Sequence, residues 1–334
     1  MVDKRQLGAA GPLVHPLGIG AMSFSAFYGP TTDENSYAIL DHAHARGVAH
    51  IDTANVYGMG RSETAIGTWI KARGAAVRED LVLATKGAIT RDAAGARFFD
   101  NSPQHLEAEL DASLQRLGVD CVDLYYVHRR EADRPIEEVA GTLGRLVEKG
   151  KTKAIGFSEI APASLRRAHA EYPVAAVQSE YSLSTRAPEM GLVQTCKDLG
   201  VALVAFSPVG RSLLTDSPLT PDVIATLDFL KNNPRFIAPN YAANIALTAP
   251  FRALAAEMGL AASSLAIAWV AARGAHVLPI PGTRSVAHLD ELITGAERVL
   301  SAAEIAAVEA VLPLGWCHGD RYTEDQWVGP ERYC

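Results

Sequence analysis

Four side chains able to deliver a proton to a carbonyl oxygen stand near the ends of short apolar runs. Asp52, Lys86 and His128 each end such a run, and Tyr57 follows Asp52 by five residues. A tyrosine of pKa ~10 is a weak acid at neutral pH. A lysine ammonium ~4 Å away favours the phenolate by about 4 kcal/mol at an effective dielectric of ~20. We therefore expect Lys86 to lower the pKa of Tyr57, by up to roughly three units before desolvation opposes it.

Asp52 would hold Lys86 charged and correctly aimed, and a neutral His128 would donate a hydrogen bond to a substrate oxygen. A structural alternative remains, in which Asp52 caps a loop and Lys86 is only its ion-pair partner. No side chain of the set can deliver hydride, so reduction of a carbonyl would need a separate redox cofactor.

The elements that must position these residues are short apolar runs alternating with amphipathic segments. The runs lack strict alternation, which is typical of strands buried on both faces. Eight such strands, each followed by a helix, predict a (β/α)8 TIM barrel, in which reactive groups gather at the carboxyl ends of the strands. The runs are Leu17–Gly20, Val48–Asp52, Leu81–Lys86, Val122–His128, Ala154–Phe157, Ala175–Gln178, Ala202–Ser207 and Val277–Ile280.

Capping residues and prolines predict where the helices begin and end. One helix is expected from Asp33 to Arg46, a second from its cap Ser62 to Arg73, and a third from Ser102-Pro103 to Leu117. Further helices are expected to begin at Pro135, Pro162 and Pro188. Residues 209–250, between the seventh and eighth strands, are too long for a simple connection and contain a helix-like piece, Pro221–Lys231.

Composition narrows the functional class. The chain has 31 basic and 38 acidic residues, a net charge of −7, which argues against nucleic acid as a partner. Its four cysteines form no CxxC pair, the N-terminus has no apolar signal region, and charge interrupts the most apolar stretch, Leu265–Pro281. We therefore expect a cytoplasmic protein with no membrane segment.

Two other patterns are weak. His42 and His44 are two residues apart on a predicted helix and point to different faces, so no metal site is expected. Gly18 and Gly20 lack the third glycine of a dinucleotide fingerprint, so no Rossmann domain is expected.

Seven segments, in order along the chain, together resemble the aldo-keto reductase family. The first is His-Ile-Asp-Thr-Ala-Asn-Val-Tyr-Gly-Met-Gly-Arg-Ser-Glu at residues 50–63. The others are Ala-Thr-Lys at 84–86, Leu-Tyr-Tyr-Val-His at 124–128, Ile-Gly-Phe-Ser at 155–158, Val-Gln-Ser-Glu-Tyr at 177–181, Ala-Phe-Ser-Pro-Val-Gly-Arg at 205–211 and Pro-Ile-Pro-Gly-Thr-Arg at 279–284. The resemblance extends from about Arg5 to at least Leu312.

This resemblance implies one barrel over residues 1–334, with a bottom-closing hairpin at 4–15 and an aromatic tail at 314–334 on the active-site face. It implies Tyr57 as general acid, Asp52, Lys86 and His128 as the rest of the catalytic set, and NADPH as cofactor. Arg284 would bind the 2′-phosphate, and Phe206 would face the nicotinamide. The implied cofactor contacts are Gly20, Met22, Asp52, Ser158, Gln178, Phe206, Ser207, Val209, Gly210, Arg211, Ile280, Gly282, Thr283, Arg284, His288 and Glu291.

Substrate contacts are expected from Phe24, Tyr28, Tyr57, His128 and Arg129, with Trp316 as a further candidate. The chain departs from the family pattern at three positions: Glu159 replaces an asparagine, Leu292 replaces an adenine-binding asparagine, and Ser285 replaces a basic residue. The expected substrate is a small carbonyl compound, and the oligomeric state is open.

Two alternatives to carbonyl reduction also remain open. One is an NADPH-binding regulatory subunit with little turnover. The other is physiological oxidation of an alcohol by the same site.

Overall fold

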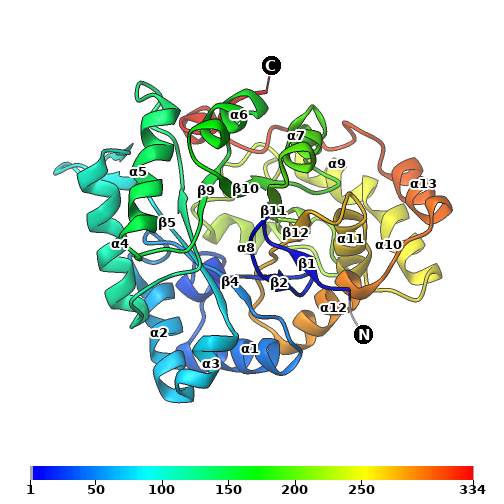
Figure 1. The fold of residues 1–334 in the computed structure, drawn as a ribbon. Coiled ribbons are helices and arrows are strands. Elements are labelled where there is room, and N and C mark those ends of the chain that lie inside the picture. Colours follow the sequence, from blue (N-terminus) through cyan, green and yellow to red (C-terminus); the bar gives the residue numbers. More distant parts are fainter. Residues whose placement is uncertain (1–2, 334) are drawn as a thin grey trace.

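The computed structural model describes residues 3–333 and contains an eight-stranded parallel sheet in the centre of the molecule (Figure 1). Its strand order is β12-β11-β10-β9-β8-β5-β4-β3. The strands are β3 (Ile19–Gly20), β4 (His50–Asp52), β5 (Val82–Gly87), β8 (Leu124–Val127), β9 (Ile155–Ser158), β10 (Val174–Glu180), β11 (Ala202–Phe206) and β12 (Val277–Pro279). All eight predicted strands are confirmed.

Backbone hydrogen bonds close this sheet into a barrel. The Gly18 N–H donates to Pro279 O and the Gly20 N–H donates to Pro281 O, both at 3.0 Å, so the first and last strands are neighbours. A Cβ at residue 20 would lie 2.7 Å from Ile280 O, which explains a glycine at this closure. Eight parallel strands joined first to last and surrounded by helices confirm the predicted (β/α)8 architecture.

Helices surround the strands (Figure 1). They are α1 (Asp33–Ala45), α2 (Arg61–Arg73), α3 (Ala75–Asp80), α4 (Pro103–Leu117), α5 (Ile136–Glu148), α6 (Pro162–Glu171), α7 (Leu192–Leu199), α8 (Pro221–Thr226), α9 (Asn240–Leu247), α10 (Ala249–Glu257), α11 (Ala262–Ala271), α12 (Val286–Glu297) and α13 (Ala302–Val311). The ends of α4 follow the sequence signals, since Ser102 accepts from the His105 N–H and Gly118 is left-handed at φ 67°.

Three helix predictions are wrong in detail. Gly60, not Ser62, is the N-cap of α2, because the Ser62 hydroxyl donates instead to Ala21 O. Pro188 lies in a 3₁₀ turn, and α7 begins only at Leu192. The helix at Pro221 ends at Thr226, since residues 227–236 continue as successive turns.

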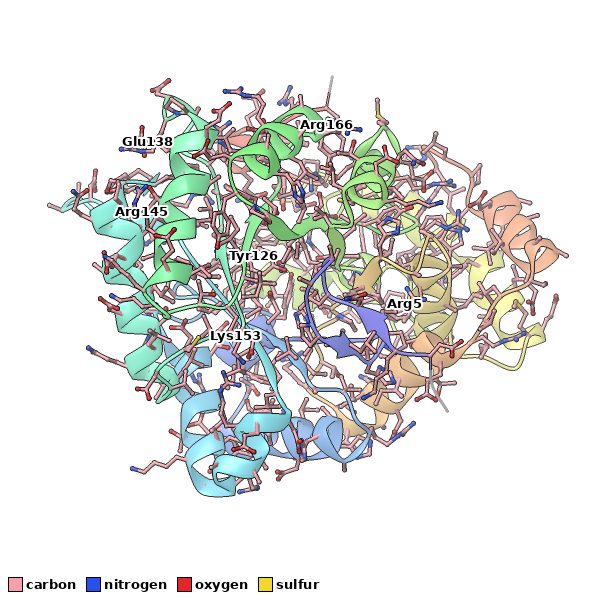
Figure 2. All side chains as sticks on the ribbon, in the orientation of Figure 1. Arg5, Tyr126, Glu138, Arg145, Lys153 and Arg166 are labelled. Carbon is pink, nitrogen blue, oxygen red and sulfur yellow. The ribbon has the colours of Figure 1, made fainter. Side chains whose placement is uncertain are left out.

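The N-terminal hairpin, β1 (Arg5–Gln6) and β2 (Leu13–Val14), pairs antiparallel and lies in front of the strands in Figure 1. Leu7 and Val14 join the buried apolar cluster formed by the inward-facing strand residues. The Arg5 guanidinium, labelled in Figure 2, donates to Gly274 O at 3.1 Å and anchors the hairpin near β12. A hairpin thus lies within the predicted range 4–15, and its apolar side chains pack against the barrel strands.

Two further segments, a second hairpin and the C-terminal segment, lie at the opposite end of the barrel. A second hairpin, β6 (Ile89–Arg91) with β7 (Arg97–Phe99), follows β5. The C-terminal segment, residues 314–333, contains a 3₁₀ turn at Glu324–Trp327 and approaches α6, where the Ala161 N–H donates to the Glu331 carboxylate at 2.7 Å.

Among the described helices, none is by itself long and apolar enough to cross a membrane. One bent pair, Asn240–Glu257 with Ala262–Ala271, passes on length and composition alone, with an angle of 88° between its parts.

Candidate active site

Adjacent parallel strands bring the acid and the lysine of the predicted set together. Asp52 ends β4 and is in register with Ala84 of β5, two residues before Lys86. The Lys86 ammonium donates to the Asp52 carboxylate, to Thr53 O at 2.8 Å and to the Tyr57 hydroxyl at 3.3 Å. Lys86 is fully buried and Asp52 is 1% exposed, so the lysine charge is balanced directly by the carboxylate.

Tyr57 is positioned by the tight loop between β4 and α2. Its N–H donates to Ala54 O at 3.2 Å, and its carbonyl accepts from the Ser62 N–H at 3.2 Å. Gly58 follows with φ 62°, a left-handed conformation that favours glycine. The turn directs the phenol back over Lys86, whose nitrogen is 4.9 Å from the ring centroid.

His128 faces Tyr57 from the end of β8. The two rings meet edge to face, with centroids 5.8 Å apart and an interplanar angle of 80°. The His128 N–H donates to Gly87 O at 3.0 Å, which ties this position to β5. Four residues that lie 5 to 76 positions apart in sequence therefore form one cluster at the carboxyl ends of three strands.

The electrostatics of the cluster correct one expectation. Burial raises the pKa of Tyr57 above 10.0, and the opposing charge of Lys86 does not reverse this direction. The prediction of a lowered pKa is wrong because desolvation of the phenolate outweighs the ammonium. Burial tends to lower the pKa of Lys86, but Asp52 raises it overall, so the lysine stays charged.

His128 is neutral at physiological pH. Burial holds its pKa well below 6.5, and the positive charges of Arg129 and Lys86 act in the same direction. A neutral imidazole next to a protonated tyrosine provides two uncharged hydrogen-bond donors side by side, the ring N–H and the phenolic O–H.

A cavity of about 1250 Å³ opens above this cluster. Its lining includes almost every residue predicted to contact cofactor or substrate, and these residues come from the N-terminal, central and C-terminal parts of the chain. These are Gly20, Met22, Tyr28, Asp52, Tyr57, His128, Arg129, Ser158, Gln178, Phe206, Ser207, Val209, Arg211, Ile280, Gly282, Thr283, Arg284, His288 and Glu291.

Three of the predicted contact residues do not line this cavity. Phe24 is 1% exposed and packs in the hydrophobic core, so its expected substrate contact is wrong. Trp316 also packs in the core, where its indole N–H donates to Leu183 O at 2.8 Å. Gly210 is buried in a turn in which its N–H donates to Ser207 O at 2.9 Å.

One end of the cavity is suited to a phosphate group. Ser285 caps α12, accepting from the His288 N–H, and the helix N-terminus carries free N–H groups and a partial positive charge. Arg284 precedes this cap and reaches across the cavity to donate to Pro30 O at 3.2 Å. Glu291, on the same helix, accepts from the Ser263 hydroxyl at 2.8 Å.

The middle of the cavity offers amide and hydroxyl groups. Gln178 donates to Asp52 at 2.8 Å, and the Ser158 hydroxyl accepts from Arg129 at 3.0 Å. Phe206 ends β11 beside them and is half-buried. Hydrogen-bonding groups next to an exposed ring face suit a flat polar heterocycle.

Glu159, a departure from the family pattern, belongs to a buried ion network. Its carboxylate accepts from Arg321 of the C-terminal segment and from the Glu180 N–H at 2.7 Å. Arg211 donates to Glu180 at 2.6 Å and is itself buried. The guanidinium of Arg211 is thus directed into protein, although the residue lines the cavity.

The sequence patterns did not predict Arg97, Phe229 and Tyr322, which also line the cavity. Arg97 lies in the β6–β7 hairpin, whose Asp92-Ala-Ala-Gly95 turn between short β-branched or aromatic runs was the available signal. Phe229 and Tyr322 come from irregular segments, and their rings meet at 6.3 Å. Such segments have no periodicity that predicts which face they turn to the site.

The histidines near the N-terminus pair with carboxylates on other elements. His42 contacts Asp290 at 2.8 Å and His44 contacts Asp80 at 3.0 Å. No group of three or more His, Cys, Asp or Glu residues able to hold a metal was found within residues 3–333.

Comparisons with known proteins agree with this arrangement. The model of the aldo/keto reductase family matches residues 16–313. The aldo-keto reductase yakc of Schizosaccharomyces pombe, named as an NADP(+) enzyme, is 37% identical over 325 residues, covering 96% of this chain and 94% of that protein. An aldo-keto reductase of Strobilurus tenacellus is 37% identical over 329 residues, covering 96% and 95%.

Among solved structures, a glycerol dehydrogenase of Gluconobacter oxydans superposes with a TM-score of 0.81. It is 25% identical and covers 93% of this chain and 95% of its own. Because the family model and both 37% relatives extend over most of the sequence, the chain belongs to the aldo/keto reductase family.

Proposed function

We propose that this protein reduces an aldehyde or ketone to the alcohol with NADPH, and that Tyr57 is the general acid. The observation that carries the proposal is the Lys86 ammonium at the base of the cavity. It bridges the Asp52 carboxylate and the Tyr57 hydroxyl, while His128 faces the same hydroxyl-bearing ring. Reduction of a carbonyl by NADPH needs a proton donor beside the substrate, here Tyr57, and a charge that stabilises the donor after the proton leaves, here Lys86 paired with Asp52.

The residues of the cavity fit an extended dinucleotide with an additional phosphate. Arg284, His288 and the N-terminus of α12 would hold the 2′-phosphate, because a guanidinium fork and free helix N–H groups both favour phosphate. Ser158 and Gln178 would hold the carboxamide of the nicotinamide, with Phe206 against its ring. When bound, this cofactor supplies the hydride.

The side chains of the protein manage the proton. Tyr57 donates its phenolic proton to the carbonyl oxygen as negative charge develops there. Lys86, held by Asp52 and by Thr53 O, stabilises the resulting phenolate. Neutral His128 donates a hydrogen bond to the same oxygen and orients it.

Two alternatives use the same geometry. Alcohol oxidation is this reaction reversed, with Tyr57 accepting the proton. A regulatory subunit would bind NADPH tightly but turn it over very slowly, so the turnover number separates it from an enzyme.

NADPH consumption by the purified protein tests the proposal. The substrates are aromatic aldehydes, α-dicarbonyls and bulky cyclic ketones, each assayed with wild type and Tyr57→Phe. The variant is expected to lose roughly 10²–10⁴-fold in kcat, because a positioned general acid contributes about this much.

The affinity of Tyr57→Phe for NADPH, measured by fluorescence titration, is expected to equal that of wild type. A variant that keeps full activity would refute Tyr57 as the acid. Tight NADPH binding with no turnover in either direction would favour the regulatory subunit.

A further inference from the structure

Two arginines near His128 line the cavity. Arg129 follows His128 directly, and Arg97 lies on β7 of the second hairpin; both line the cavity. Within residues 3–333, neither guanidinium has a carboxylate oxygen within the 4.0 Å of an ion pair. This stands out in a chain of net charge −7, where acidic partners are abundant.

The contacts that these arginines do make engage neutral oxygens. Arg129 uses one terminal nitrogen to donate to His128 O at 2.6 Å and to the Ser158 hydroxyl at 3.0 Å. Arg97 donates to Asp325 O at 3.1 Å. Each guanidinium carries five N–H donors, so most of its donors are not used in these hydrogen bonds.

Packing holds Arg129 in place, whereas Arg97 is exposed and lies over an aromatic ring of its own hairpin. A Cβ built on Gly329 would lie 2.6 Å from the Phe99 ring and 3.3 Å from Arg129 Cβ. The C-terminal segment therefore packs closely against Phe99 and Arg129. The Arg97 guanidinium lies 5.5 Å from the centroid of the Phe99 ring. A cation held as Arg129 is held is pre-organised for an anion and loses little entropy on binding it.

The two charges act on each other and on the catalytic histidine. Burial and then Arg129 lower the pKa of Arg97; burial lowers the pKa of His128 most, and both arginines act in the same direction. Adjacent like charges are costly, and an anion between them would relieve this repulsion.

The nearby acidic groups do not supply that anion. Glu159 is paired with Arg321, and Glu109 accepts a hydrogen bond from Asn55. The hydrogen bond between Asp325 and Arg97 uses the backbone oxygen of Asp325. The Asp325 carboxylate acts on Arg97 only through its charge, at longer range.

Aromatic side chains also line this cavity. Tyr322 and Phe229 meet edge to face at 6.3 Å, and Tyr28 lines the same cavity. Aromatic faces suit a flat apolar body between the reacting carbonyl and the anion.

We propose that the preferred substrate is an aromatic or similarly flat carbonyl compound that also carries a carboxylate, which Arg97 and Arg129 bind while the carbonyl reaches Tyr57 and His128. The proposal rests on the proposed reductase function and specifies its substrate class. A carboxylate matches the guanidinium fork, which binds it through paired charge-assisted hydrogen bonds.

The test compares 3- and 4-carboxybenzaldehyde with their methyl esters, which keep the ring and aldehyde but lack the charge. In wild type, kcat/KM is expected to be at least tenfold higher for one of the acids than for its ester. Arg97→Met is expected to reduce this acid-to-ester ratio by about tenfold, the loss of a charge-assisted hydrogen bond. Arg97→Lys keeps the charge and is expected to retain part of the ratio.

Arg166→Met is the matched control, since Arg166 is a half-exposed cation on α6, outside the barrel, and is labelled in Figure 2. It is expected to leave the ratio unchanged. Unfolding midpoints establish that each variant is folded.

Esters reduced as well as acids by wild type, or a ratio unaltered in Arg97→Met, would overturn the carboxylate proposal and leave the reductase function standing. An absence of turnover with all four aldehydes, together with NADPH binding, would overturn the proposed function and this inference with it.

Discussion

At the scale of the residue, burial and charge act in opposite directions on Tyr57, and burial dominates. The phenol lies in a site where Lys86 is fully buried and already balanced by Asp52. In the proposed reaction the ammonium would stabilise the phenolate once the proton has left, and the resting tyrosine stays protonated. This is the appropriate state for an acid that acts during carbonyl reduction.

The pH dependence of reduction follows from these directions. The pKa of Tyr57 is raised above 10.0, so its acid form persists up to that pH; the pKa of His128 is well below 6.5, so its neutral form persists down to that pH. We therefore expect kcat/KM to be flat between pH 6.5 and pH 10. Initial rates in buffers of constant ionic strength check this.

An inflection near pH 8 that persists in a His128→Gln variant would contradict a raised Tyr57 pKa. An inflection lost in that variant would instead contradict the neutral histidine.

At the scale of the element, close helix packing fixes how α2 and α4 cross. Gly67 lies in the middle of α2, where a Cβ would be 2.3 Å from Arg116 O and 2.8 Å from Leu117 O of α4. Backbone atoms cannot give way as a flexible side chain can. The crossing matters to the site because α2 begins directly after the Tyr57 loop.

Gly67→Ala is expected to lower the free energy of unfolding by about 1–3 kcal/mol, because overpacking outweighs the helix propensity that alanine gains. Gly141, in the interior of α5, is the matched control, since its added Cβ would meet only flexible side-chain atoms, the nearest being Glu171 Oε1 at 3.4 Å. Gly141→Ala is expected to stabilise by up to about 1 kcal/mol. Urea denaturation measures both, and two changes of the same sign would contradict this account of the crossing.

At the scale of the whole molecule, buried charges attach the C-terminal segment to the barrel. Arg321 contacts Glu159 after β9 and lies 3.7 Å from Glu180 of β10. The Glu331 N–H also donates to Glu159 O, at 2.8 Å. Burial favours the neutral form of Glu159, yet Arg321 lowers its pKa overall, so the pair is ionised. Tyr322, the neighbour of Arg321, is thereby held against the cavity.

Glu159→Gln is expected to destabilise the protein by about 3 kcal/mol, because removing one partner leaves a buried guanidinium without its main counter-ion. The double variant Glu159→Gln with Arg321→Met is expected to lose less than the sum of the single losses. Thermal unfolding measures the stabilities, and limited proteolysis reports loosening of residues 314–333.

Glu137→Gln, which removes an exposed ion pair with Arg167, serves as the control. It is expected to change neither the stability nor the proteolysis of residues 314–333 measurably. Strict additivity of the two buried substitutions would show that Glu159 and Arg321 do not act as a pair.

The sequence by itself determined the strands, most helix boundaries and the cluster around Tyr57. Strand ends are readable because buried runs are apolar and caps are local, and parallel β/α repeats place all carboxyl ends on one face. Asp52, Lys86 and His128 could therefore be predicted to meet without knowledge of any contact.

Only the tertiary structure decided the rest. The direction of the Tyr57 pKa depends on how completely the surroundings exclude water, and the exclusion of Phe24 and Trp316 from the cavity depends on which way irregular backbone turns. Arg97, Arg129 and Tyr322 come together through contacts between segments up to 225 residues apart. Desolvation and long-range packing are properties of the assembled chain, and no local pattern encodes them.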